Sequence, residues 1–83
     1  MTLDEQTAYF DRNFDKAYAR CLRDFKANKE TIRLLSRERL IGGERTYGDR
    51  GFRWPYERLR YEMLEEFADA PVYRLMMMYQ GWH

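Results

Sequence analysis

Cysteine and histidine are almost absent from this sequence. Cys21 is the only cysteine among 83 residues, so one chain can form neither an internal disulfide nor a cysteine-based zinc site. His83 is the only histidine, which excludes a histidine-based catalytic triad and a multi-histidine metal site within one chain. The lack of disulfides fits a reducing compartment, and we expect a cytoplasmic protein.

A long apolar run is also missing. The first residues are acidic and carry no secretory signal pattern. The most apolar tract, residues 72–79, is interrupted by Arg74 and is far too short to cross a bilayer. The five glycines form no phosphate-binding loop, because none precedes the Lys-Ser/Thr pair that such a loop requires. We therefore expect no membrane segment and no P-loop chemistry.

Charge of one sign is not in excess, because the net charge is +1. Residues 1–53 carry 12 basic and 9 acidic residues (+3), and residues 54–83 carry 3 and 5 (−2). Such a mild asymmetry argues against a dedicated nucleic-acid binder. It suits a basic first half that packs beside an acidic second half.

Large apolar side chains are abundant for so short a chain: seven Tyr, five Phe, two Trp and five Met. A domain of this size buries only about 60% of the surface that its unfolded chain exposes. Part of this apolar surface should therefore meet a second copy or another protein. We predict one all-α domain over residues 1–83, a bundle of three or four helices completed by oligomerisation, most simply as a homo-oligomer.

The first helix is predicted over residues 3–27. Thr2 and Glu5 have the spacing of a capping box, and apolar residues then recur every three or four positions. These residues are Phe10, Phe14, Ala17, Tyr18, Cys21, Leu22 and Phe25. Because Cys21 lies on this apolar stripe, we interpret it as a small core residue and not as a nucleophile.

Four basic residues share the other side of this helix: Arg12, Lys16, Arg20 and Arg23. A solvated surface with nearby acidic partners is the simple interpretation. The alternative is a stripe that binds an anionic partner, which makes weak nucleic-acid binding a third functional hypothesis.

The second helix is predicted over residues 29–41, with Asn28 as its cap and a buried side of Ile32, Leu35 and Leu40. One long helix with a phase break is the alternative. In either case we expect the paired glycines at 42 and 43 to end it.

A long central loop is then expected over residues 42–54, where no period is visible. Tyr47, Phe52 and Trp54 alternate there with arginines. These aromatic side chains either anchor the loop on the core or contact a partner.

The last helix is predicted over residues 55–80, with Pro55 at its first position and Pro71 as a kink or restart. Its buried stripe comprises Tyr56, Leu59, Met63, Phe67 and Ala70. The terminal part is apolar on more than one side, which indicates burial against a partner. Together with the aromatic residues of the central loop, we expect Met77, Met78, Tyr79 and Trp82 to contact the partner.

Four carboxylates lie at i, i+3, i+4 and i+7 of this helix: Glu62, Glu65, Glu66 and Asp69. This spacing places them on one side of the helix. Neighbouring carboxylates repel one another unless a cation lies between them. Salt bridges to Arg58 or to the first helix are one interpretation, and a magnesium site is the other.

Residues 65–76, Glu-Glu-Phe-Ala-Asp-Ala-Pro-Val-Tyr-Arg-Leu-Met, resemble the acidic helix of MazG-like nucleotide pyrophosphohydrolases, and residues 47–50 are similar to short phage-encoded relatives. The family carries E-E-x-x-E and E-x-x-D pairs on neighbouring helices. The resemblance implies all-α dimers or tetramers whose magnesium engages a nucleoside triphosphate. It implies Glu66 and Asp69 as ligands, assisted by Glu62 or Glu65. Since the chain has no second E-E-x-x-E pair, a complete site would need another subunit.

Two main functions compete. We favour a protein-binding module without a cofactor, by resemblance a phage or mobile-element accessory or inhibitor protein, that acts through the aromatic loop and the last helix. The alternative is a magnesium-dependent MazG-like nucleoside triphosphate pyrophosphohydrolase that is assembled at an oligomer interface.

Overall fold

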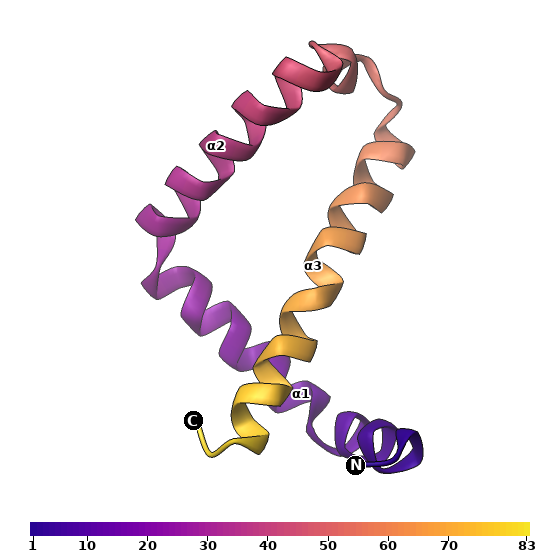
Figure 1. Ribbon diagram of the computed structural model, residues 1–83, viewed down its shortest axis with the longest axis vertical. Helices are drawn as coiled ribbons and strands as arrows, with labels where there is room; N and C mark the ends of the chain where they lie inside the picture. The colour runs from indigo at the N-terminus through magenta and orange to yellow at the C-terminus, as the bar shows by residue number, and fades with distance from the viewer.

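The protein is all-α, as predicted, and is described here from a computed structural model that covers residues 1–83 (Figure 1). Helix α1 spans Leu3–Ala27, α2 spans Lys29–Tyr47, and α3 spans Tyr56–Tyr79. A short 3-10 helix, η1, spans Arg50–Arg53 between α2 and α3. No helix combines the length and the apolar character that a bilayer crossing requires.

Helix α1 begins with the expected capping box. The Thr2 hydroxyl accepts a hydrogen bond from the Glu5 amide, and the Glu5 carboxylate accepts one from the Thr2 amide, each at 3.1 Å. Hydrogen bonding from Thr2 lowers the pKa of the Glu5 carboxyl. Asn28 was expected to cap α2, but its side chain instead donates to the Asp24 carbonyl at 2.8 Å. Asn28 therefore occupies the N-cap position of α2, and its carbonyl accepts the Ile32 amide, but its side chain satisfies the end of α1.

Helix α2 continues through Gly42 and Gly43, so the prediction of a helix end at residue 41 and a loop over 42–54 is wrong. Both glycines keep negative φ, and a glycine inside a helix lowers stability by only about 1 kcal/mol. The helix ends at Gly48, whose φ of 66° favours glycine over other residues. Much of the remaining connection is helical as well, because η1 lies within it.

Helix α3 is continuous through Pro71, with no restart. Proline inside a helix removes one hydrogen bond and crowds the preceding turn, at a cost of about 3 kcal/mol. The Pro71 side chain is buried, and the apolar contacts of its ring offset part of this cost.

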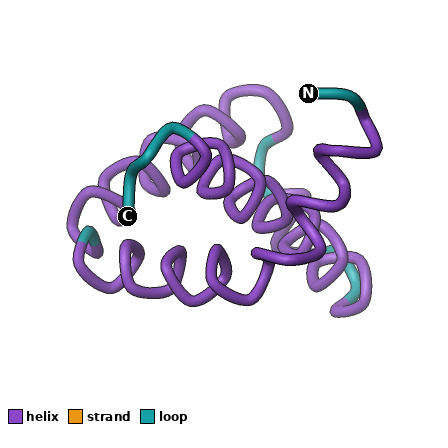
Figure 2. Tube along the Cα trace, turned by 90° about the horizontal axis from the view of Figure 1, so that it is seen from below, coloured by secondary structure: helices purple, strands orange, loops and turns teal.

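The core lies where α1 crosses α3. Ala17 is fully buried there against Leu75 and Met78, and Tyr9 packs beside them. Helix α2 contains no buried residue and makes little contact with α3. The three helices therefore form an open frame, in which α2 and α3 meet only at the η1 end (Figures 1 and 2).

Only six of the 83 residues are buried. The predicted buried sides of α2 and of the first half of α3 are therefore wrong for the single chain. Ile32, Leu35 and Leu40 are exposed, and so are Tyr56, Leu59, Met63 and Phe67. The periodic patterns mark real apolar faces, but no other part of the chain covers them.

The molecule is expanded for its size. Its radius of gyration is 15.9 Å, whereas a compact domain of this length has about 12 Å. Its accessible surface is 7505 Å², against about 5,400 Å² for a compact monomer of 10.3 kDa. About 2,100 Å² of surface per chain is thus exposed in excess.

We predict that Ala17→Leu disrupts the crossing. Its added methylene groups have no space between Leu75 and Met78, and overpacking of this kind costs about 1–3 kcal/mol. Urea unfolding followed by circular dichroism measures the loss. Ala19→Leu is the matched control, because Ala19 is exposed on the same helix and its change should stay within about 0.5 kcal/mol. Equal effects of the two substitutions would contradict the packing described here.

Candidate protein-binding surface

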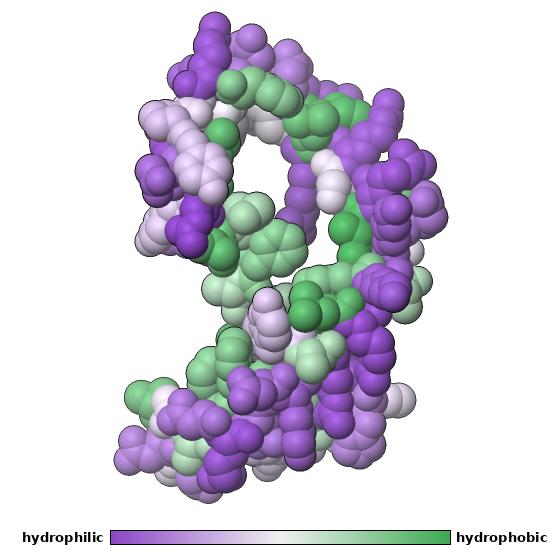
Figure 3. All heavy atoms as spheres, turned by 180° about the vertical axis from the view of Figure 1, so that it is seen from behind, coloured by the Kyte–Doolittle hydropathy of each residue, from purple (hydrophilic) through white to green (hydrophobic).

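Apolar side chains border an opening through the molecule in the space-filling view (Figure 3). They belong to helices that are far from each other in sequence. Two pockets, one between α2, η1 and α3 and the other between α1 and α3, are lined by apolar side chains. Exposed apolar side chains that gather in pockets are typical of sites of association.

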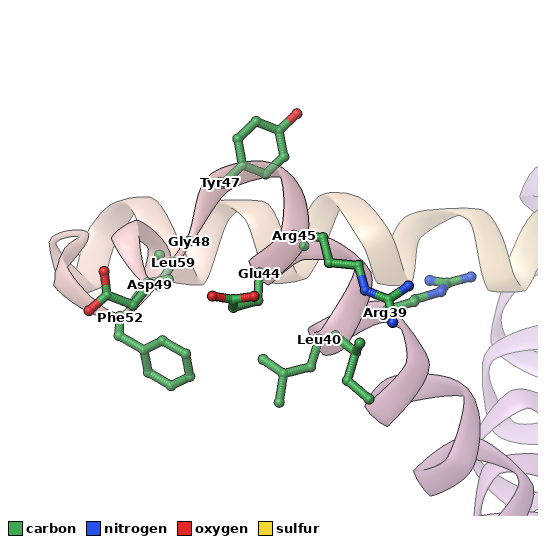
Figure 4. A pocket seen from close by; sticks show the side chains of 12 residues that line it. Arg39, Leu40, Glu44, Arg45, Tyr47, Gly48, Asp49, Phe52 and Leu59 are labelled. Atoms are coloured by element: carbon green, nitrogen blue, oxygen red, sulfur yellow. The ribbon is translucent and has the colours of Figure 1, made fainter.

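The larger pocket, which we call the distal pocket, lies where α2, η1 and the first turns of α3 meet (Figure 4). Its volume is about 810 Å³. Its apolar wall is formed by Leu40, Ile41, Tyr47, Phe52 and Leu59. Leu40 and Phe52 point to the same side in the close-up, whereas Tyr47 points away from them. The Phe52 side chain is the most exposed of the wall, at 79%.

The charges around the distal pocket are of mixed sign. Arg39, Arg45, Glu44 and Asp49 contribute to its lining, and only Asp49 has an ion-pair partner in the chain, Arg53 at 2.8 Å. Two cations and two anions therefore flank the apolar wall. This pattern suits a neutral protein surface better than a strongly anionic or cationic ligand.

The smaller pocket, the crossing pocket, has a volume of about 260 Å³ and lies between α1 and α3. Seven of its eight lining residues are apolar, and the Phe25 and Phe67 rings meet there at a centroid distance of 6.1 Å. Cys21 lines its floor, and burial raises the pKa of this thiol. A buried, protonated thiol is a poor nucleophile, in agreement with the interpretation of Cys21 as a core residue.

The predicted partner-binding residues separate into two groups. Tyr47 and Phe52 belong to the distal pocket, and Trp54 is half-buried beneath Arg58, whose guanidinium lies 3.6 Å from the ring centroid. The other group, Met77, Tyr79 and Trp82, is exposed at the far end of α3. Met78 is part of the core, so its placement at a partner surface is wrong.

A polar contact joins α1 to α3 beside the core. The Arg74 side chain is buried, with its Nε atom 3.3 Å from an Asp24 carboxylate oxygen. This approach is an ion pair by distance and not a hydrogen bond, because Nε has no hydrogen-bond partner. Arg74 and Arg23 each donate to the His83 carbonyl, at 2.9 and 3.0 Å. An arginine inside an otherwise apolar stretch was the available signal, because buried charges require partners.

The acidic row, Glu62, Glu65, Glu66 and Asp69, does not form a metal-binding cluster within the chain. Glu62 is half-buried and the other three carboxylates are exposed, and no three acidic, cysteine or histidine side chains are grouped closely enough to hold a metal ion. None of the row forms an ion pair, so the expected pairing with Arg58 is wrong. Glu65 raises the pKa of the Tyr61 hydroxyl, first through hydrogen bonding and then through its charge.

The basic stripe of α1 lines neither pocket. Arg12 and Lys16 are exposed without an ion-pair partner, while Arg23 pairs with Asp24 at 3.5 Å. The stripe and the acidic row therefore lie outside the apolar surface.

Comparison with protein-family models, with curated proteins and with solved structures finds no match to this chain. The resemblance to MazG-like proteins stays a prediction.

We predict that Asp24→Asn lowers the free energy of unfolding by at least about 1 kcal/mol, because it leaves the buried Arg74 charge without its counter-ion. Asp15→Asn is the control, since Asp15 is exposed on the same helix and unpaired. Thermal and urea unfolding of both variants measure the difference. A loss of the same size in both would show that the contact between Asp24 and Arg74 contributes little.

Proposed function

We propose that this chain is a small protein-binding module that acts through the apolar surface of its two pockets. The observation that carries the proposal is the excess of about 2,100 Å² of accessible surface over a compact monomer. Standard protein interfaces bury about 800 Å² on each partner, so the excess is large enough for a stable complex.

The chemistry of the distal pocket favours a protein partner. Its wall combines aliphatic and aromatic side chains with charges of both signs, which is the composition of an interface centre with a polar border. Phe52 and Leu40 provide apolar anchors of the kind that dominate binding energy. A nucleic-acid partner would require an excess of cations along the groove. The two arginines of the distal pocket are instead balanced by Glu44 and Asp49, and the basic stripe of α1 lines neither pocket.

The shape of the surface supports an apolar helix as the bound element. A helix satisfies its own backbone hydrogen bonds, so it can lie on an apolar wall without leaving polar groups unpaired. The open frame offers such walls on α2 and α3 at one end and on α1 and α3 at the other.

Photo-crosslinking in cells tests the proposal. We expect benzoylphenylalanine at Leu40 or Leu64, one in each pocket, to give a covalent protein adduct, because a bound partner covers both positions. The same group at Glu65, which is exposed on α3 but lines neither pocket, is the matched control. Adducts should be at least about tenfold weaker there, in line with the enrichment of contacts at interface centres.

Absence of adducts from both pocket positions would contradict protein binding by this surface. Equal adducts at all three positions would contradict it as well, because they would report non-specific contact.

The acidic row supports a second candidate function, the MazG-like pyrophosphohydrolase. The observation that favours it is that four carboxylates share one side of α3 without any basic partner in the chain. In this hypothesis another subunit supplies the remaining ligands of the magnesium ion, and the ion engages the phosphates of the nucleotide.

This second candidate predicts that magnesium and a nucleoside triphosphate together raise the melting temperature by several degrees, because a ligand that binds only the native state stabilises it. The rise, and any release of pyrophosphate, should disappear in Glu66→Gln and Asp69→Asn. Glu57→Gln, outside the row on the same helix, should retain both. An unchanged melting temperature with both ligands present would rule out this function.

A further inference from the structure

We infer that the partner of the distal pocket is a second copy of this chain, in a two-fold dimer that packs α2 and the distal pocket of one copy against those of the other. This inference rests on the proposed protein-binding function and names its partner. A two-fold interface presents the same surface from both sides, so that surface must complement itself in area and in charge.

The area fits one additional copy. Burial of the excess, about 2,100 Å² on each chain, gives about 4,200 Å² in total, which lies within the range of about 2,000–5,000 Å² for obligate homodimers. After this burial, each of the two copies would expose about as much surface as a compact monomer of its mass, without a third component.

The charge also complements itself. The distal pocket is flanked by two arginines, Arg39 and Arg45, and by two acidic residues, Glu44 and Asp49. Three of these four have no ion-pair partner in their own chain. A two-fold rotation can bring cations of one copy to anions of the other, and a net charge of +1 per chain causes little repulsion.

Helix α2 has the exposure that such a contact requires. It has no buried residue, and it carries Leu35 and Leu40 beside the glycine pair at 42 and 43. No atom of the chain lies close to where side chains on these glycines would be, so intrachain packing does not explain them. Their small size allows a second helix to approach α2 closely at the pocket.

The oligomeric state in solution provides the test. Sedimentation equilibrium should give twice the chain mass of 10.3 kDa for the unmodified protein. Leu40→Asp should raise the dimer dissociation constant at least about 100-fold, because it places a charge in the apolar centre of the interface. Leu3→Asp is the matched control and should leave the dimer intact. Leu40 is 57% exposed and Leu3 is 72% exposed, but only Leu40 lines the pocket.

Charge reversal identifies the surface without relying on Leu40. Glu44→Arg and Arg45→Glu, both at exposed positions, should each weaken self-association at least about tenfold at low salt, because each gathers like charges at the two-fold interface. An equimolar mixture of the two variants should recover a heterodimer. If Leu40→Asp loses its helical circular dichroism signal, the equimolar mixture of the two charge variants tests the interface instead, because a heterodimer can form only from folded chains.

A monomer at millimolar concentration would overturn the inference. A dimer that persists unchanged in Leu40→Asp and in both charge variants would overturn it too, because another face would then form the contact. A crosslinked adduct from Leu40 that contains a different protein, and none of twice the chain mass, would leave the protein-binding function standing and refute self-association.

Discussion

The crossing of α1 over α3 is the contact on which the rest of the structure depends. Ala17 is fully buried there, and its short side chain allows the two helices to approach closely. The ion pair between Asp24 and Arg74 joins the same two helices about two turns farther along α1. Every other element is attached to this crossing only through the chain or through a few contacts at its ends.

The open frame follows from helix lengths. From Ala17 to its end α1 extends about 15 Å, and α2 and the part of α3 before Leu75 each extend about 28 Å. Packed helices lie about 8–10 Å apart. The free arm of α1 therefore holds the start of α2 too far from α3 for direct packing. The long helices converge only at η1, where the distal pocket lies (Figure 4).

Capping residues and apolar periodicity were sufficient to predict that these segments are helical, but not which of their side chains are buried. The capping box at Thr2 and the apolar stripe around Ala17 identified α1 with its bounds. The glycine pair misled, because glycine permits a helix as well as a turn, and the left-handed conformation falls at Gly48. Ile32 and Phe67 lie on real apolar faces, yet burial depends on the distance between helices, which periodicity does not encode. The pockets combine residues from separate helices and had no signal of their own.

The proposed association would be coupled to folding. The buried core is restricted to a few side chains at the crossing, whereas the larger apolar area borders the opening. A domain of this size gains little stability from its own core. The partner proposed for the pockets would therefore also stabilise the frame, because it would bind only the folded chain. The two charged rows, the basic one on α1 and the acidic one on α3, line neither pocket. Under the proposed function, the core at the crossing would hold the frame while the side chains of the pockets would bind the partner.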